Sequence, residues 1–357
     1  MKNKMKKTTK SNFITYGIVI VFYIVMQILV GTGSISSLLK GLLVPLCVYA
    51  IMAVSLNLTV GILGELSLGH AGFMCVGAFA SAFFSMCTRD SLTNGPVRFI
   101  IAIIIGAIVA AIFGILIGIP VLRLRGDYLA IVTLAFGEII KNVMNVLYVG
   151  KDGSGLHISI KDAMSLNLDE SGKVIINGAQ GITGTPNDAT FTIGIIILLI
   201  SLFIILNFVN SRSGRAVMAI RDNRIAAESI GINISKYKMM AFAISASLAG
   251  AAGALYAHNL STLTALPKNF GYNMSIMILV YVVLGGIGNI RGSMIAAVIL
   301  TVLPELLRGF SDYRMLIYSI VLIVMMLFNW SPKARELREK YSFKKILKKK
   351  HTGREDA

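Results

Sequence analysis

Residues 191–209 read FTIGIIILLISLFIILNFV, a run without a single charged side chain. A helix needs about 20 mostly apolar residues to cross the hydrocarbon core of a bilayer. The chain then changes character at once, because residues 211–238 read SRSGRAVMAIRDNRIAAESIGINISKYK and carry six Lys and Arg side chains. The apolar run predicts a transmembrane helix, and the basic stretch predicts a segment that leaves the membrane.

The whole chain repeats this pattern of long apolar runs between short polar stretches. Of its 357 residues, 55% are hydrophobic and 14% are charged, whereas soluble domains carry roughly 25% charged residues. We therefore expect an all-α polytopic membrane protein, a bundle of about ten transmembrane helices. The candidate spans are residues 13–30, 38–60, 66–86, 97–121, 127–148, 191–209, 237–257, 272–289, 292–308 and 313–330. Whether 66–86 and 272–289 cross the bilayer completely is left open.

The distribution of basic residues predicts the orientation of the chain. If all ten segments span and the N-terminus is cytoplasmic, most of the 34 Lys and Arg residues fall on the cytoplasmic side, as the positive-inside rule requires. We expect a basic cytoplasmic N-terminus (1–12), a transmembrane domain (13–330) and a basic cytoplasmic tail (331–357). The net charge of +17 then indicates contact with anionic lipid and not with nucleic acid.

Two polar segments interrupt the predicted bundle. Residues 149–190 are rich in Gly, Asn, Asp and Ser, so they predict an external, turn-rich loop. Residues 211–236 have helical spacing instead and predict one or two short helices on the cytoplasmic face. Asp222 or Asn223 is placed to cap a second helix, and Gly231 is placed to end it.

Glycine and alanine predict how the helices pack and where they break. Gly106, Ala110, Gly114 and Gly118 recur every four residues, and residues 246–257 carry similar small-residue stripes, which are typical of close helix packing. The stretches GELSLGHAGF (64–73) and LGGIGNIRG (284–292) predict broken helices. Such breaks are tolerated in a membrane where they are buried in protein or line a wet cavity, and they often mark a transport path.

Signatures of catalysis are missing from the sequence. There is no Walker loop, no H-E-x-x-H and no G-x-S-x-G, so we expect no catalytic residues, no metal and no cofactor bound by this chain. The cysteines Cys47, Cys75 and Cys87 fit buried apolar positions. Glu138 and Lys141 are three residues apart on one helical face and predict an ion pair, as do Glu305 and Arg308.

Five blocks of the sequence resemble the permease subunits of branched-chain amino-acid ABC transporters, of the LivM type. These blocks cover most of residues 40–310 in the order found in that family, whereas any one of them alone would be weak. They read GELSLGHAGFMCVGAFASA, LRGDYLAIVTLAFGEII, GITGTP, GRAVMAIRDNRIAAESIGINISKYKMMAFAISASLAGAAGALYA and VLGGIGNIRGSMIAAVILTVLPELLR.

The resemblance implies a transport subunit of an importer in the plasma membrane of a prokaryote. The implied partners are two cytoplasmic ATPase subunits that bind ATP, a second related permease chain and an external substrate-binding protein that docks on the outer loops. The implied ATPase-coupling residues are Gly214, Arg215, Val217, Ile220, Arg221, Ala226, Ala227 and Gly231. The implied translocation path contains Ser67, Gly69, His70, Gly72, Gly77, Glu138, Gly285, Gly286 and Gly288.

The coupling segment departs from the family pattern at one position. Ala226, Ala227 and Gly231 have the spacing of the importer motif E-A-A-x-x-x-G, but Ile225 stands where the glutamate would be. This puts in doubt any salt bridge from that position to an ATPase.

Three functions remain in competition at this stage. The resemblance favours import of leucine, isoleucine and valine, with urea or short amides as the alternative cargo of close relatives. An ion-coupled secondary carrier would depend on Glu138, Glu305 or His70, although no predicted span carries a central run of acidic residues. The third reading is a membrane protein with a structural role and no transport.

Overall fold

The computed structural model describes residues 2–33, 36–89, 91–124, 126–153, 155–169 and 172–330. The basic tail predicted at 331–357 lies outside the described residues. The chain divides into two compact units, Met1–Ile299 and Leu300–Ala357. The first unit contains all of the predicted ATPase-coupling residues and all of the predicted path residues.

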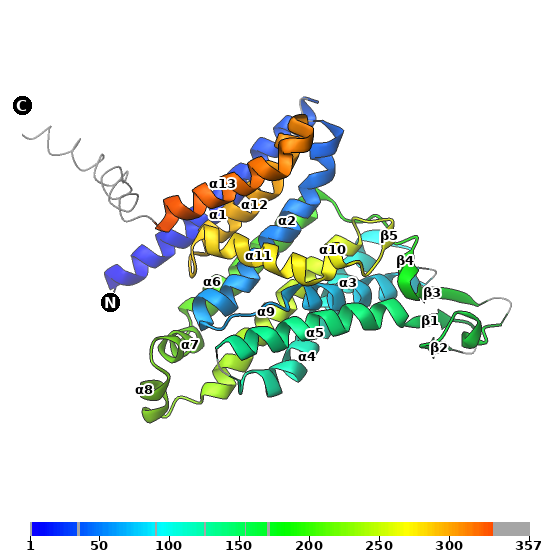
Figure 1. The fold of residues 1–357 in the computed structure, drawn as a ribbon, viewed down its shortest axis with the longest axis horizontal. Helices are drawn as coiled ribbons and strands as arrows, with labels where there is room; N and C mark the ends of the chain where they lie inside the picture. Colours follow the sequence, from blue (N-terminus) through cyan, green and yellow to red (C-terminus); the bar gives the residue numbers. More distant parts are fainter. Residues whose placement is uncertain are drawn as a thin grey trace, which may run out of the picture. The chain divides into compact units, whose positions relative to one another are not determined.

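Helices dominate the first unit (Figure 1). They are α1 (Lys2–Gly31), α2 (Ser37–Asn57), the π-helix η1 (Leu58–Leu63), α3 (His70–Cys87), α4 (Gly95–Val121), α5 (Asp127–Val146), α6 (Phe191–Asn210), α7 (Arg212–Asp222), α8 (Arg224–Ser229), α9 (Ile234–Ala257), α10 (Pro267–Phe270) and α11 (Tyr272–Gly285). The helix α12 (Ile290–Leu306) continues into the second unit, which also contains the 3-10 helix η4 (Leu307–Tyr313) and α13 (Arg314–Trp330).

Eight helices in the described part of the chain are long and apolar enough to cross a membrane. This confirms the all-α polytopic class and corrects the predicted number of about ten. The segment predicted at 272–289 forms α11, whose 14 residues span about 21 Å, less than the ~30 Å of hydrocarbon. It ends early because Gly286 adopts a φ of 96° that breaks the helix. The segment at 313–330 forms α13 with 17 residues, whereas α3 with 18 is among the eight.

The small-residue stripes form the centre of the bundle. The helix α9 packs against α2, α3 and α4, with α4 as a major neighbour. A Cβ placed on Gly250 would lie 2.6 Å from the Gly106 carbonyl oxygen, and one placed on Gly114 would lie 2.6 Å from the Ala246 Cβ. The backbones therefore approach as closely as the stripes predicted, and larger side chains would push α4 and α9 apart.

Short strands lie in the segment that follows α5. β1 (Tyr148–Lys151) pairs antiparallel with β2 (Leu156–Ser159) and with β3 (Lys173–Asn177), in the order β2-β1-β3. A second pair joins β4 (Ile182–Thr183) to β5 (Thr262–Leu263), just after α9. The sequence analysis predicted a turn-rich loop here and missed these strands, because glycine and turn residues outnumber the short alternating runs.

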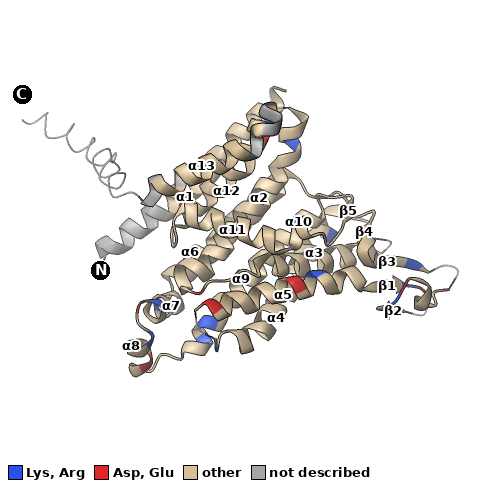
Figure 2. Ribbon diagram, in the orientation of Figure 1, with Lys and Arg blue, Asp and Glu red and all other residues tan. Residues whose placement is uncertain are grey.

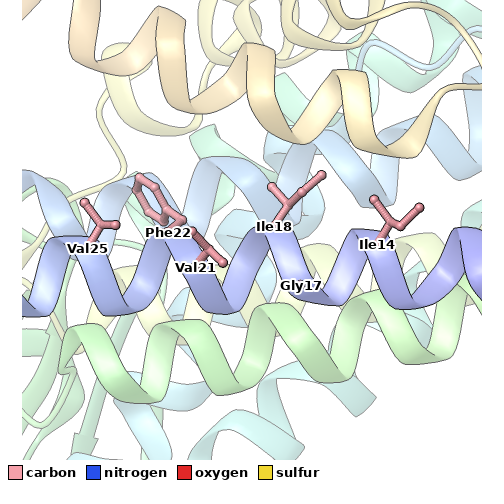
Figure 3. Close-up of a pocket in the computed structure, with 6 residues that line it drawn as sticks. All are labelled: Ile14, Gly17, Ile18, Val21, Phe22 and Val25. Carbon is pink, nitrogen blue, oxygen red and sulfur yellow. The ribbon is translucent and has the colours of Figure 1, made fainter. Parts of the chain in front are cut away.

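The helix α1 contributes apolar surface at the edge of the unit. The Tyr23 hydroxyl lies 3.1 Å from the Thr192 hydroxyl at the start of α6. Figure 3 shows a groove along α1 that is lined by its own side chains. A separate cavity of about 140 Å³ is lined by apolar residues of α1, α2, α6 and the start of α12. Both surfaces suit lipid tails better than a charged amino acid.

Candidate functional site

The basic segment forms two short helices, α7 and α8, joined by one residue. The Ser211 hydroxyl accepts a hydrogen bond from the Gly214 N–H at 3.1 Å and caps α7. The Asn223 side chain accepts from the Ala226 N–H at 3.0 Å and caps α8, while Gly231, with a φ of 82°, follows its end. The predicted pair of helices, the Asn223 cap and the glycine end are thus confirmed.

The predicted coupling residues divide into a buried and an exposed set. Ile220 and Ala227 pack with Ile234 of α9 in an apolar cluster that Ile232 and Tyr237 extend. These contacts fix α7 and α8 to the start of α9. The buried members of the predicted set are Gly214, Val217, Ile220 and Ala227, and the exposed members are Arg215, Arg221, Ala226 and Gly231.

The exposed surface of α7 and α8 is both basic and apolar. Arg212 and Arg215 are exposed on α7, and Ile225 is 81% exposed on α8. Ile230, directly after α8, is 75% exposed. Figure 2 shows Lys and Arg residues along this end of the unit, whereas the helices α3, α6 and α11 carry no charged side chain. Ile225 thus presents an apolar side chain at the position where the importer motif has its glutamate.

Arg221 points back into the bundle, although its side chain is partly exposed. Its Nη1 donates a hydrogen bond to the Gly61 carbonyl oxygen in η1 at 2.9 Å. Its Nε and Nη2 donate to Asp222 Oδ1 at 3.0 and 2.8 Å, which fixes the guanidinium plane. Arg221 was predicted as a coupling residue, and the structure places it between α7 and η1.

A second charged contact ties the same region together. Lys238 of α9 forms an ion pair with Glu65, which lies just beyond η1, and both side chains are largely buried. The sequence analysis did not predict this pair, because 173 residues separate the partners. The available signal was a glutamate and a lysine that each stand at the end of an apolar run.

The predicted path residues near α3 come together where two helices begin inside the bundle. α3 begins at His70 after the non-helical stretch 64–69, and α11 begins at Tyr272. The Ala71 N–H of α3 donates to the Ser275 hydroxyl of α11 at 3.1 Å, so the two helix starts are in contact. Both belong to elements that the sequence predicted to be broken or incomplete spans.

Polar side chains surround these helix starts. His70 is buried, and its Nε2 lies 2.8 Å from the Ser55 hydroxyl of α2. The Thr133 hydroxyl accepts from the Leu68 N–H at 3.0 Å. Ser67 is also buried, and its hydroxyl has no hydrogen-bond partner among the described residues. The environment is polar in the middle of an apolar bundle.

Glu138 of α5 closes one side of this polar region. It forms the predicted ion pair with Lys141, and its Oε1 accepts a hydrogen bond from the Tyr272 N–H at 2.8 Å. Gly69 and Gly72 pack on the same stretch of α5, since a Cβ on Gly72 would lie 2.7 Å from the Gly137 Cα. Gly77 lies further along α3 and packs against Gly250 of α9, in a helix contact.

The remaining path residues form the turn between α11 and α12. Gly286 and Gly288 have φ values of 96° and 80°, a conformation that favours glycine. Gly285 packs closely against Ser293 within this turn. The Gly288 N–H donates to Asn57 Oδ1 at 2.9 Å, and Asn57 Nδ2 donates to the Ser293 hydroxyl at 2.6 Å. The sequence analysis missed Asn57, a lone amide within an apolar run.

A different set of contacts holds the other end of α9. Arg98 at the start of α4 pairs with Asp188 at 3.2 Å. His258, the residue after α9, packs against Phe99 with the rings tilted by 48° and their centroids 4.7 Å apart, and its Nδ1 donates to the Ala254 carbonyl oxygen at 2.9 Å. Burial lowers the pKa of His258, and the Ala254 carbonyl and the Asp188 charge oppose that shift. The imidazole is therefore neutral at pH 7.

Among the described residues, no three His, Cys, Asp or Glu side chains lie close enough together to hold a metal ion. Cys47, Cys75 and Cys87 are free, and the first two are buried. In the second unit, Glu305 and Arg308 form the predicted ion pair at 3.0 Å.

Comparisons with known proteins identify the family of the chain. Residues 38–329 match the family described as "Branched-chain amino acid transport system / permease component". The chain is 34% identical over 294 residues to the high-affinity branched-chain amino acid transport system permease protein LivM of Salmonella typhimurium, covering 80% of this chain and 67% of the relative. The Escherichia coli protein of that name has the same identity and coverage. LivH of Salmonella typhimurium is 23% identical over 286 residues, covering 78% of this chain and 88% of the relative. No solved structure matches.

Proposed function

The chain belongs to the family of branched-chain amino acid permease components, and we propose that it carries leucine, isoleucine and valine into the cell. It is a multi-pass membrane protein and a permease subunit of an ATP-binding-cassette importer. The observation that carries the proposed cargo is the match over residues 38–329 together with the identity to LivM. Urea or short amides are the alternative cargo, and an ion-coupled carrier is the less favoured mechanism.

We propose that two separate ATPase subunits bind the ATP and dock on α7 and α8. The sequence supports this because it contains no Walker loop. The exposed surface supports it because Arg215, Ile225 and Ile230 combine charge with apolar area, a combination common at protein interfaces. Ile225 would make an apolar contact where other importers use the glutamate.

We propose that an external substrate-binding protein docks on the β1–β3 sheet. Leu156, Ile158 and Ile160 alternate along the edge strand β2 and beyond it, and are 56%, 70% and 71% exposed. Met164 is 90% exposed in the next turn. Large apolar side chains that remain exposed outside the membrane helices favour a protein-docking surface.

The charges of α7–α8 and of the β1–β3 region support an orientation of the chain in the membrane. α7, α8 and the sheet lie at opposite ends of the first unit in Figure 1. Residues 211–238 carry six basic and two acidic side chains, whereas residues 148–190 carry three basic and five acidic ones. We therefore propose that α7 and α8 are cytoplasmic in a prokaryotic plasma membrane, with both termini on that side.

We propose that the substrate passes the helix starts of α3 and α11. The dipole of a helix start favours a negative group such as the substrate carboxylate. Among the residues that the structure describes, the buried Ser67 hydroxyl has no hydrogen-bond partner, so it is available to a polar ligand. The predicted residues Ser67, Gly69, His70, Gly72 and Glu138 lie here, whereas Gly77 packs between helices.

A second permease chain is proposed as the partner within the membrane. LivM and LivH of Salmonella typhimurium are both named as permease proteins of a high-affinity branched-chain amino acid transport system, and this chain is similar to each. That pairing of names favours a heteromeric pair over two copies of one chain.

Reconstitution tests the proposed function. The chain, its ATPases, the second permease and the binding protein are placed in liposomes, and uptake of labelled leucine and of urea is measured with and without ATP. We expect ATP-dependent leucine uptake that is absent with ADP. Leucine uptake by the chain alone, driven by an ion gradient, would support the secondary carrier, and uptake of urea alone would reassign the cargo.

A further inference from the structure

We infer that Arg221, bonded to Gly61 of η1, and Asn57, the residue before η1, transmit movement of α7 to the glycine-rich turn between α11 and α12. This group of Arg221, η1, Asn57 and the turn 286–289 is termed the η1 relay. The inference rests on the proposed function, because it describes how ATPase movement reaches the path. It assigns positioning roles to two residues and does not place either of them in contact with substrate.

The π-helix η1 is the first part of the relay. All six of its residues are buried, and it contacts both α7 and the start of α9. The Gly64 N–H donates to the Thr59 carbonyl, five residues back, and Gly64 has a φ of 80°. π-Helical turns are rare and occur frequently at functional sites. A wide helical turn followed by a left-handed glycine is a place where the backbone changes direction.

Arg221 connects α7 to this turn. Its Nη1 bond to the Gly61 carbonyl oxygen is charge-assisted, and such bonds are about twice as strong as those between neutral groups. Asp222 holds the guanidinium from the other side. A Cβ on Gly64 would lie 2.5 Å from Arg221 Cγ, so the aliphatic part of the side chain also rests on this backbone. Displacement of α7 therefore displaces residues 61–64.

Asn57 connects the same turn to the second broken segment. Its amide accepts from the Gly288 N–H and donates to Ser293, 231 and 236 residues away in the sequence. The side chain is fully buried. Gly61 packs against the backbone of the turn, since a Cβ on Gly61 would lie 2.6 Å from the Gly288 Cα. An amide of this length supplies the acceptor and the donor together, and leucine, of similar shape, supplies neither.

The two broken segments are thus both attached to η1. The stretch 64–69 leads from η1 to the start of α3, and the turn 286–289 leads from α11 to α12. A helix that moves with an ATPase would shift both segments at once, because the stretch 64–69 continues directly from η1, and the turn 286–289 packs on Gly61 and bonds to Asn57. Chains of polar and packed contacts of this kind are the physical route by which distant sites are coupled.

The test uses the complete importer in liposomes and measures ATP hydrolysis and labelled leucine uptake on the same vesicles. The variants are Asn57→Leu, Ser293→Ala and Arg221→Gln, with Arg221→Lys as the conservative replacement. Arg123→Gln, at an exposed arginine that follows α4 and lies outside α7 and α8, is the matched control for charge. Ser201→Ala is the control for a buried hydroxyl, which in α6 bonds within its own helix.

We expect uptake per ATP hydrolysed to fall at least ~5-fold in the relay variants, the lower range of measured coupling between sites. Arg221→Lys should recover part of the loss, and both controls should stay near wild type. Uptake and hydrolysis that fall together would indicate a merely structural role and overturn the inference. Unchanged values in Asn57→Leu and Arg221→Gln would overturn it as well.

A second readout does not depend on the cargo. Ile287 is 56% exposed in the turn, so Ile287→Cys, in a chain with Cys47, Cys75 and Cys87 replaced, accepts a thiol reagent. We expect its labelling rate to change when ATP is trapped in the complex and expect Asn57→Leu to abolish the change. If the wild-type complex fails to import leucine but this response is present, the proposed cargo fails and the relay stands. A response that persists in Asn57→Leu overturns the relay.

Discussion

The two ends of α9 are stabilised in different ways. Near its start, Lys238 pairs with the Glu65 side chain, and Arg221 and Asn57 bond to the backbone of Gly61 and Gly288. At its end, the strands β4 and β5 pair through their backbones, and Arg98 pairs with Asp188 beside a buried histidine. Side-chain bonds across glycine turns permit concerted movement, whereas strand pairing and continuous helices resist it. Under the inferred relay, the end of α9 near α7 and α8 moves with the ATPases, and the end at β4 and β5 stays fixed.

The largest expected effect comes from the buried ion pair at the moving end. Lys238→Met leaves Glu65 as an uncompensated, largely buried charge, and breaking such a pair typically costs about 3–5 kcal/mol. We expect loss of folded protein in a detergent thermal-melt assay by size-exclusion chromatography. The double variant Lys238→Met with Glu65→Leu should recover most of the loss. If the single variant melts like wild type, the pair does not stabilise this end.

Overpacking the middle of α9 should produce the next largest effect. Gly250→Val places a side chain against Ala110 and the Gly106 carbonyl, and such overpacking costs about 1–3 kcal/mol. The same assay should show a lower melting temperature. Ala243→Val is a milder comparison on the same helix, at a position that is less buried. Equal stability of Gly250→Val and wild type would contradict the close approach of α4 and α9.

We expect docking of the ATPases to depend on the exposed side chains of Ile225 and Ile230. Ile225→Asp with Ile230→Asp should keep the chain folded, because both side chains are exposed, and should weaken co-purification of the ATPase at least ~10-fold, as for an interface hot spot. The measurement is a pull-down in mild detergent with quantitative mass spectrometry. Leu156→Asp in β2 is the control on the opposite end. Undiminished ATPase recovery would mean that α7–α8 is not the docking surface.

A smaller effect of pH is expected at the fixed end. The pKa of His258 is lowered by burial, so the unfolded chain, with a pKa of about 6.5, binds the proton more tightly than the folded one. Stability from this group is therefore present above pH 6.5 and declines as the pH falls below it. Melting temperatures of wild type and His258→Gln across pH 5–8 should converge at low pH. A wild-type stability that rises on acidification relative to His258→Gln would contradict the assignment.

The sequence predicted features that are set by neighbours along the chain. The ends of α7 and α8, the Asn223 cap and the Glu138–Lys141 pair all depend on residues a few positions apart. The small-residue stripes also predicted close helix packing, because the spacing of Gly and Ala on a single helix is sufficient to indicate it. The glycine pattern located the two broken segments, and the structure joins the second of them to Asn57 through the Gly288 N–H.

The features that escaped prediction depend on residues distant in sequence. The Lys238–Glu65 pair and the Asn57 bonds join residues 173 and 231 positions apart, so no local pattern indicates them. The strands β1–β3 were missed because Gly, Asp, Ser and Asn, which mark turns, make up much of this segment. The length of α11 was overestimated because hydropathy continues through Gly286, whereas the backbone turns there.

Distances between spin labels would test the difference between the two ends most directly. The labels are placed on Arg212→Cys in α7, Ile287→Cys in the turn and Leu156→Cys in β2, two at a time, in the complete importer without and with trapped ATP. We predict that the Arg212–Ile287 distance stays constant and that the Ile287–Leu156 distance changes, because α7 and the turn move as one body relative to the sheet. A change in the first distance with a constant second distance would contradict the account.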